Sequence, residues 1–283
     1  MSWIVFILIG LITKSFSSLL SKVILNNKSD PAFYIVGRWL LIGIFGVVLL
    51  AITDKFNFVL SLQNILLLAL EALLSAGAVF YYFGLDKVEL SRANILGTVS
   101  VLISIFIGSL FLGEILTLNK FFAFALIVVS FTILNGGKKV IEGKFNKFDV
   151  LIIIGSLFDP FIYVIDKKLI ISSNPETILA LAYLCASAVV LLLNIGRLKN
   201  ALATYRDTLY WKIAVPDAFI LFLSYLAIFS SFALGEISKS YIILQSQVLL
   251  VAIMGIIFLK ERDNLGRKLI ASFLCFIAMI IVV

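Results

Sequence analysis

Ten long apolar runs follow one another along this sequence of 283 residues, with only short polar joints between them. A bilayer core of roughly 30 Å needs about 20 apolar residues for each helical crossing, which is close to the length of each run. Hydrophobic residues make up 62% of the chain and charged residues 14%, a balance typical of a membrane protein. The sequence therefore predicts an all-α integral membrane protein with ten transmembrane helices. The expected spans are residues 3–25, 33–53, 63–86, 93–112, 118–137, 148–171, 175–196, 212–234, 239–259 and 265–283.

Lysine and arginine are distributed unevenly over the joints. The joints after the first, third, fifth, seventh and ninth spans hold 16 of the 23 basic residues, whereas the joints on the other side hold five. Cytoplasmic loops of membrane proteins carry an excess of basic residues. We therefore expect a multi-pass protein of the plasma membrane with both chain termini outside.

The sequence also contains an internal repeat. VLISIFIGSLFLGE ends at Glu114 and VLLVAIMGIIFLKE ends at Glu261, and an offset of 147 residues aligns the two stretches without a gap. An offset of 145 residues places residues 10–22 over residues 155–167, at the starts of the two halves. The expected units are a first five-helix repeat in residues 1–137, a basic linker in residues 138–147 and a second five-helix repeat in residues 148–283.

An odd number of helices in each repeat means that the two repeats enter the membrane from opposite sides. Inverted repeats of this kind are typical of secondary transporters, in which the substrate binds near the bilayer midplane between the repeats. Movement of one repeat against the other then exposes the site to alternate sides. We therefore expect two inverted five-helix repeats around a central cavity.

The last part of each repeat resembles a known family. GLDKVELSRANILGTVSVLISIFIGSLFLGE and ALGEISKSYIILQSQVLLVAIMGIIFLKE resemble two copies of the EamA-type repeat of the drug/metabolite transporter superfamily. The resemblance covers essentially the whole chain and implies a ten-helix transporter. Its most specific element is Leu-Gly-Glu at 112–114, where the second copy has Lys260 in place of the glycine. We therefore interpret Glu114 and Glu261 as structural residues at the membrane interface that fix the turn into the next helix, rather than as substrate contacts.

Four ionisable residues fall in the middle of expected spans: Lys14, Glu71, Asp159 and Asp217. A charge at that depth costs at least about 2.5–3.5 kcal/mol, so each is a functional candidate. Lys14 and Asp159 occupy matching repeat positions and are expected to pair. In the related small multidrug transporters, a helix-one glutamate at a similar spacing before a lysine couples transport to protons, and this resemblance implies that role for Asp159. A static buried ion pair is the alternative.

Glu71 and Asp217 stand one place apart in the repeat alignment and are expected to face each other across the cavity. Three carboxylates against the amine of Lys14 would give a negative interior that favours a cationic or zwitterionic substrate. Burial would instead favour protonated carboxyls that carry protons. The sequence leaves both possibilities open.

Aromatic and amide side chains within the spans complete the expected binding site. Aromatic rings hold amine or quaternary ammonium groups by cation–π attraction, although many rings serve only for packing. Polar residues four apart lie on one face of a helix, where they line a cleft or bond to a neighbouring helix. The expected substrate contacts, besides Glu71 and Asp217, are Trp39, Tyr81, Tyr82, Tyr163, Tyr225, Asn94, Thr98, Tyr241 and Gln245.

These features predict a secondary-active, proton-coupled transporter of a small cationic or zwitterionic metabolite. Its expected partners are this substrate, protons and the lipid bilayer, with no nucleic acid, cofactor or metal. A neutral or anionic cargo with Lys14 as the anion contact is the nearest alternative, and a non-transporting scaffold or sensor is a further one. The chain contains no histidine and no phosphate-binding glycine loop, so we expect no enzyme.

Overall fold

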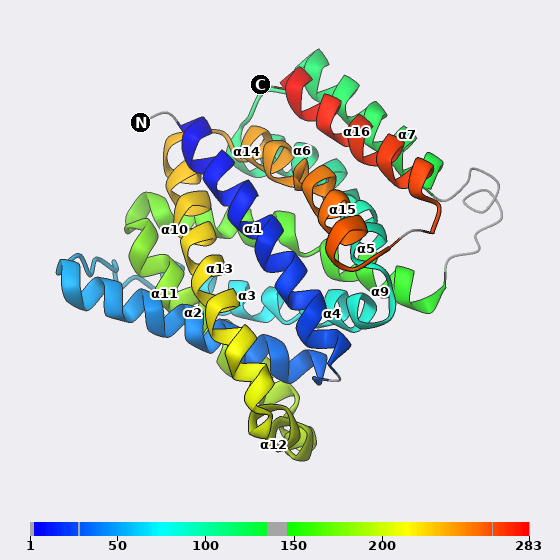
Figure 1. The fold of residues 1–283 in the computed structure, drawn as a ribbon. Coiled ribbons are helices and arrows are strands. Elements are labelled where there is room, and N and C mark those ends of the chain that lie inside the picture. The colour runs from blue at the N-terminus through cyan, green and yellow to red at the C-terminus, as the bar shows by residue number, and fades with distance from the viewer. Residues whose placement is uncertain (1–2, 28, 135–145, 262, 283) are drawn as a thin grey trace.

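The computed structural model describes residues 3–27, 29–134, 146–261 and 263–282, and within these residues the fold is helical without strands (Figure 1). The expected basic linker lies outside the described residues up to position 145. Six elements are continuous helices: α1 (Trp3–Asn26), α2 (Pro31–Thr53), α7 (Leu118–Leu134), α11 (Pro175–Leu193), α13 (Thr208–Leu234) and α16 (Leu265–Val282).

Four further elements are each built from two shorter helices separated by a brief interruption. They are α3 (Leu62–Ser75) with α4 (Ala78–Lys87), α5 (Leu90–Gly97) with α6 (Val99–Leu112), α9 (Lys147–Ser156) with α10 (Asp159–Ser172), and α14 (Ile237–Gln245) with α15 (Gln247–Phe258). Pro160 explains one interruption, because proline has no N–H to donate to the carbonyl of Ser156, where α9 ends. Pro216, by contrast, lies inside the unbroken α13.

Each expected span corresponds to one of these elements, and eight of them are long and apolar enough to cross a membrane within the described residues. The apolar part of α7 is shorter, and α16 is not one of the eight. An all-helical membrane fold is therefore confirmed. The number of ten spans and the inverted relation of the repeats remain predictions.

Helix starts follow from polar residues placed before prolines. Asp30 accepts a hydrogen bond from the backbone N–H of Ala32 at 3.0 Å, and Pro31 occupies the first turn of α2. Asn174 caps α11 in the same way, accepting from the N–H of Thr177 at 2.8 Å. Such caps satisfy backbone donors that have no partner inside the helix.

The most extensive helix contacts all join residues 3–134 to residues 146–282. They pair α1 with α13, α2 with α11, α4 with α9, and α7 with α16 (Figure 1). Small residues allow close approach: a Cβ at Gly10 would come within 2.7 Å of Ile228, and one at Gly46 within 2.8 Å of Ala180. The two halves are therefore interleaved rather than set side by side.

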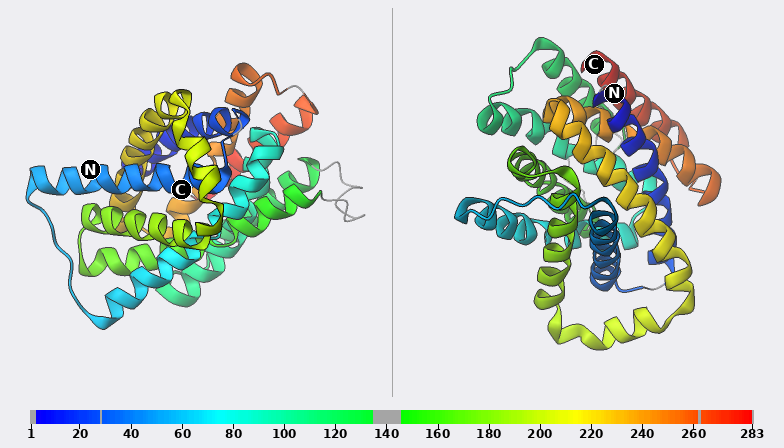
Figure 2. Two further views of the ribbon diagram at one scale, coloured as in Figure 1. Left: turned by 90° about the horizontal axis from the view of Figure 1, so that it is seen from below. Right: turned by 90° about the vertical axis from the view of Figure 1, so that its left-hand side faces the viewer.

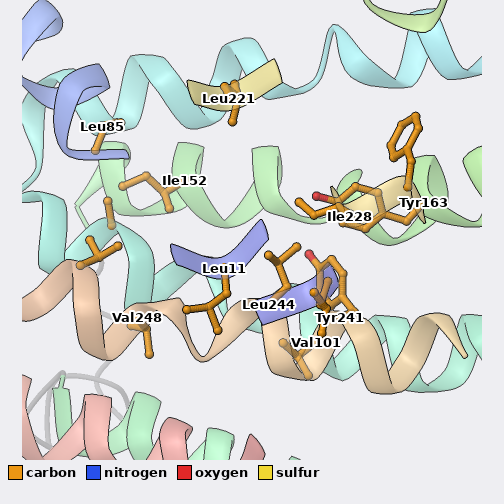
Figure 3. Packing of buried hydrophobic residues seen from close by; sticks show 14 of the residues in the cluster. Leu11, Leu85, Val101, Ile152, Tyr163, Leu221, Ile228, Tyr241, Leu244 and Val248 are labelled. Atoms are coloured by element: carbon orange, nitrogen blue, oxygen red, sulfur yellow. The ribbon is translucent and has the colours of Figure 1, made fainter. Parts of the chain in front are cut away.

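The short helix α12 (Leu198–Arg206) lies between α11 and α13 in the chain and packs against α2 and α13 at one end of the bundle (Figures 1 and 2). Inside the bundle, the apolar core contains Leu11 of α1, Leu244 of α14 and Val248 of α15 (Figure 3). The rings of Tyr163 and Tyr241 pack edge to face with their centroids 5.2 Å apart. This core surrounds the polar centre described next.

Candidate functional site

A cavity of about 120 Å³ lies inside the bundle, and helices from both halves line it. All four helix interruptions border this cavity: Ser75 and Ala78, Gly97, Ser156 and Asp159, and Gln245 and Gln247 belong to its lining. Interrupted helices at membrane depth are tolerated where the freed backbone groups face a cavity or other protein. In transporters such breaks commonly form the substrate site.

The charged residues of the lining are Lys14, Glu71, Asp159 and Asp166. Lys14 donates a hydrogen bond to the hydroxyl of Tyr163 at 3.1 Å, and its Nζ lies 5.7 Å from the ring centroid of Tyr225. The ion pairs found in the described part of the chain do not include one between Lys14 and Asp159. The two residues share the cavity as expected, but the direct pair is not formed, and the Lys14 ammonium donates to Tyr163 instead.

Asp166 is an acidic residue that the sequence analysis did not select. It is 1% exposed, and its carboxyl group lies within hydrogen-bonding reach of that of Glu71, which is 4% exposed. One oxygen of each carboxyl group, Glu71 Oε2 and Asp166 Oδ1, is buried without a hydrogen-bond partner. Asp166 follows Asp159 by seven residues, which is two helical turns, so its position on the same face of α10 was the available signal.

Asp217 does not face Glu71 across the cavity, which corrects the expectation from the repeat alignment. It is fully buried on α13 and forms an ion pair with Arg38 of α2, with 3.0 Å between Nε and Oδ2. Ser17 and Tyr34 donate hydrogen bonds to the same carboxylate at 2.5 and 2.6 Å. Asp217 pairs with the Arg38 guanidinium, because a buried carboxylate needs both a counter-charge and hydrogen-bond donors.

Most of the other expected contacts line the cavity, and their role in binding remains a prediction. These are Trp39, Tyr81, Tyr82, Tyr163, Tyr225, Asn94 and Gln245. Thr98 and Tyr241 are not part of the lining. Thr98 donates to the carbonyl of Ile95 at 2.7 Å within its own segment, whereas Tyr241 accepts a hydrogen bond from Gln245 at 2.9 Å. Tyr241 therefore contacts the cavity only indirectly, through its hydrogen bond with the lining residue Gln245.

The sequence pattern of the EamA-like transporter family matches residues 1–136 and residues 146–283. The chain belongs to the EamA-like transporter family. This EamA-like protein is therefore a multi-pass membrane transporter of the drug/metabolite type.

A solved structure described as "Crystal structure of protein" has a fold similar to that of the EamA-like transporter, with a TM-score of 0.67 and 13% sequence identity. The match covers 98% of this chain and 95% of the other. Likeness at this identity shows the fold alone. No curated protein sequence matches the chain significantly.

Glu114 and Glu261 of the EamA-like transporter each cap the start of a helix in the opposite half. Glu261 accepts hydrogen bonds from the backbone N–H groups of Leu90 and Ser91 at 2.6 and 3.0 Å, at the start of α5. Carboxylates are favourable at helix N-termini, where free N–H groups and the helix dipole present positive charge.

The contact of Glu114 is the counterpart in the other half. It accepts from the N–H groups of Ile237 and Ser238 at 2.7 and 3.1 Å, at the start of α14. The carboxylate that follows α6 therefore caps the start of α14, and the carboxylate that follows α15 caps the start of α5. The contacted residues obey the same offset of 147 as the glutamates themselves.

The same chain reversal brings both glutamates back over their own helices. The N–H of Glu114 donates to the carbonyl of Gly108 at 3.2 Å, and the N–H of Glu261 donates to that of Gly255 at 3.1 Å. The preceding residue is left-handed in both halves, with φ of 67° at Gly113 and 57° at Lys260. Lysine thus adopts the backbone conformation for which the first copy uses glycine.

Proposed function

We propose that this transporter carries a small cationic or zwitterionic metabolite, such as an amine, a quaternary ammonium or an amino-acid-like compound, by secondary active transport with alternating access. The observation that carries the proposal is the charge of the cavity lining, in which Glu71, Asp159 and Asp166 accompany a single amine, that of Lys14. Excess negative charge at membrane depth is costly, and a cation from solution offsets that cost.

The aromatic rings of the lining support a cationic cargo. The Lys14 ammonium already lies 5.8 and 5.7 Å from the ring centroids of Tyr163 and Tyr225, which is within the range of cation–π attraction. Trp39 and Tyr81 add further ring surface to the same cavity. A second ammonium group, supplied by the substrate, would find similar faces there.

We further propose that Asp159 couples transport to protons, with Lys14 as its electrostatic partner. Asp159 opens α10 at a helix interruption that borders the cavity. Because it is not engaged in an ion pair among the described residues, its carboxyl group can exchange a proton without first breaking such a pair.

Uptake of amines into liposomes that contain the purified protein tests this proposal. The wild-type protein should accumulate amine in response to a pH gradient, and Asp159→Asn should weaken the dependence on that gradient. Asp54→Asn is the matched control, because Asp54 is exposed at the end of α2. Uptake that ignores the pH gradient, together with full activity of Asp159→Asn, would remove the coupling proposal.

Export of a neutral or anionic metabolite is the second candidate. It is favoured by the Lys14 ammonium, which faces the cavity and is bound to a neutral hydroxyl rather than to a carboxylate. A thermal-shift screen that compares choline-like amines with sugar phosphates separates the two cargoes. Stabilisation by amines alone supports the first candidate, and stabilisation by phosphates alone supports the second.

The uneven distribution of basic residues supports a plasma-membrane location with both termini outside. Tags placed at each terminus of the protein in intact cells test this orientation. Protease digestion from outside should remove both tags, and protection of either one would contradict the proposal.

A further inference from the structure

Glu71 and Asp217, which stand one place apart in the repeat alignment, have neighbours of opposite charge. Asp217 is bound by the Arg38 guanidinium, whereas Glu71 contacts a second carboxyl group, that of Asp166. The offset of 145 residues that aligns residues 10–22 with residues 155–167 places Ser21 over Asp166. The second half thus has an acid where the first half has a hydroxyl group.

No cation of the described chain neutralises Glu71 or Asp166, since neither takes part in an ion pair there. Two ionised carboxylates cannot hydrogen-bond to each other, because both offer only acceptors. Their contact therefore requires a proton between them, and like charges this deeply buried cannot both ionise at low cost.

The other titratable groups near Glu71 and Asp166 do not supply a counter-charge to these two acids. α11, packed against α3 and α10, brings Tyr183 and Cys185, which are neutral in their ordinary forms. Around the cavity, α4 brings Tyr81, α13 brings Tyr225, and α10 itself carries Tyr163 and Asp159. Lys14 is the only cation in the described lining, and its hydrogen bond goes to Tyr163. Lys167, next to Asp166 in the chain, donates instead to the carbonyl of Gly235 at 2.6 Å.

A third side chain indicates that the cavity receives hydrogen-bond donors. Gln247, at the start of α15, is 5% exposed and also lines the cavity, and its carbonyl oxygen Oε1 is buried without a partner. Together with Glu71 Oε2 and Asp166 Oδ1, it makes three unpartnered acceptors in one lining. Buried acceptors without donors are rare in folded proteins, because each one costs free energy.

We propose that Glu71 and Asp166 form a second proton site, separate from Asp159, in which one shared proton and the N–H-bearing ammonium group of a substrate exclude each other. This inference rests on the proposed cationic cargo and narrows it to primary or secondary ammonium compounds, because two carboxylates need two N–H donors, whereas a tertiary ammonium has one and a quaternary ammonium has none. When the amine binds, the shared proton leaves to water and the two carboxylates accept hydrogen bonds from the ammonium group. One positive charge enters and one leaves, so the charge of the site is unchanged.

Infrared spectroscopy of the full-length protein in detergent tests the shared proton without any substrate. The wild-type protein should show the carbonyl stretch of a buried protonated carboxyl at neutral pH. Glu71→Gln and Asp166→Asn should each abolish the band, because an amide donates to the remaining carboxylate. Thermal unfolding of both variants confirms that they are folded, so that a lost band is not a lost structure.

The variant Asp159→Asn separates this inference from the proposed function. It should keep the band even though its coupling to the pH gradient is weakened. A band that is missing in the wild-type protein, or that survives in both Glu71→Gln and Asp166→Asn, overturns the shared proton. A band that disappears only in Asp159→Asn assigns the proton to that residue and overturns the inference as well.

Titration with methylammonium and with tetramethylammonium tests the exchange. Methylammonium should remove the band and release one proton per protein into a weakly buffered solution, whereas tetramethylammonium should do neither. Equal proton release by the two cations, or no change in the band at saturating methylammonium, would contradict exclusion between the proton and the ammonium group.

Discussion

Glu114 and Glu261 make the same contact in the two halves of the transporter, whereas Glu71 and Asp217 have different surroundings. Each of the first two caps a helix start in the opposite half, through backbone N–H groups that are also 147 residues apart. At the cavity, the repeat alignment matches Lys14 with Asp159, two residues of opposite charge. Asp217 is paired with a cation, that of Arg38, whereas Glu71 lies beside a second acid, Asp166.

The two regions differ because they answer to different requirements. Every helix has free N–H groups at its start and free carbonyl groups at its end, so both halves need the same compensating charges. Lys22 and Lys167 illustrate this, since they donate to the carbonyl groups of Leu85 and Gly235 at 2.7 and 2.6 Å. The cavity lining is free of that requirement, and there the repeat has diverged.

Breaking the buried ion pair should have the largest effect. Arg38→Met leaves the Asp217 carboxylate buried without a counter-charge, which should lower the free energy of unfolding by about 3–5 kcal/mol. The double variant Arg38→Met with Asp217→Asn should recover most of this loss, because neither charge remains. Thermal unfolding in detergent measures both, and equal stability of the single and double variants would contradict this assignment.

Removal of either carboxylate cap should have a smaller and similar effect in the two halves. Glu261→Ala leaves the N–H groups of Leu90 and Ser91 without their partner, at a cost of about 1–3 kcal/mol. Glu114→Ala should cost a similar amount through α14. The same unfolding assay applies, and a large loss in one half with none in the other would show that the caps are not equivalent.

Substitution of the two residues with positive φ, Gly113 and Lys260, should have the smallest effect. The change in the free energy of unfolding should have opposite signs in the two halves. Lys260→Gly should stabilise the protein by about 1 kcal/mol, because glycine adopts a positive φ without strain. Gly113→Ala should destabilise it by about 1 kcal/mol through the backbone alone, since no atom lies within 4 Å of the added Cβ. Changes of the same sign in both variants would refute this account of the two turns.

The sequence predicted the helices well, because apolar runs of membrane length have few other structures open to them. Of the interruptions inside those runs, only the one at Pro160 has a signal in the sequence, because proline removes a helix hydrogen bond. The break at Ser246 contains neither glycine nor proline, and both of its sides are apolar enough to continue as one helix. The repeat alignment correctly matched Glu114 with Glu261, but it could not show that each binds the opposite half, since an alignment gives equivalence and not contact.

The sequence predicted which residues line the cavity better than it predicted which of them contact each other. Helical periodicity and intramembrane charge identified Lys14, Glu71 and Asp159, all of which line the cavity. Partners depend on which helix packs against which, and this is decided by the tertiary packing of α2 with α13 and of α3 with α10. For that reason Arg38 and Asp166, the two residues that decide the charge balance, were not selected as partners.

Transport by two matched variants tests the central claim most directly, namely that the divergent centre carries function and the repeated ends carry structure. Glu71→Gln and Glu261→Gln each neutralise one buried glutamate, the first in the cavity and the second at a helix start. We predict that folded Glu71→Gln in liposomes loses amine uptake, whereas Glu261→Gln unfolds at a lower temperature and transports normally per folded molecule. Normal uptake by Glu71→Gln, or loss of uptake by a stably folded Glu261→Gln, would contradict the account.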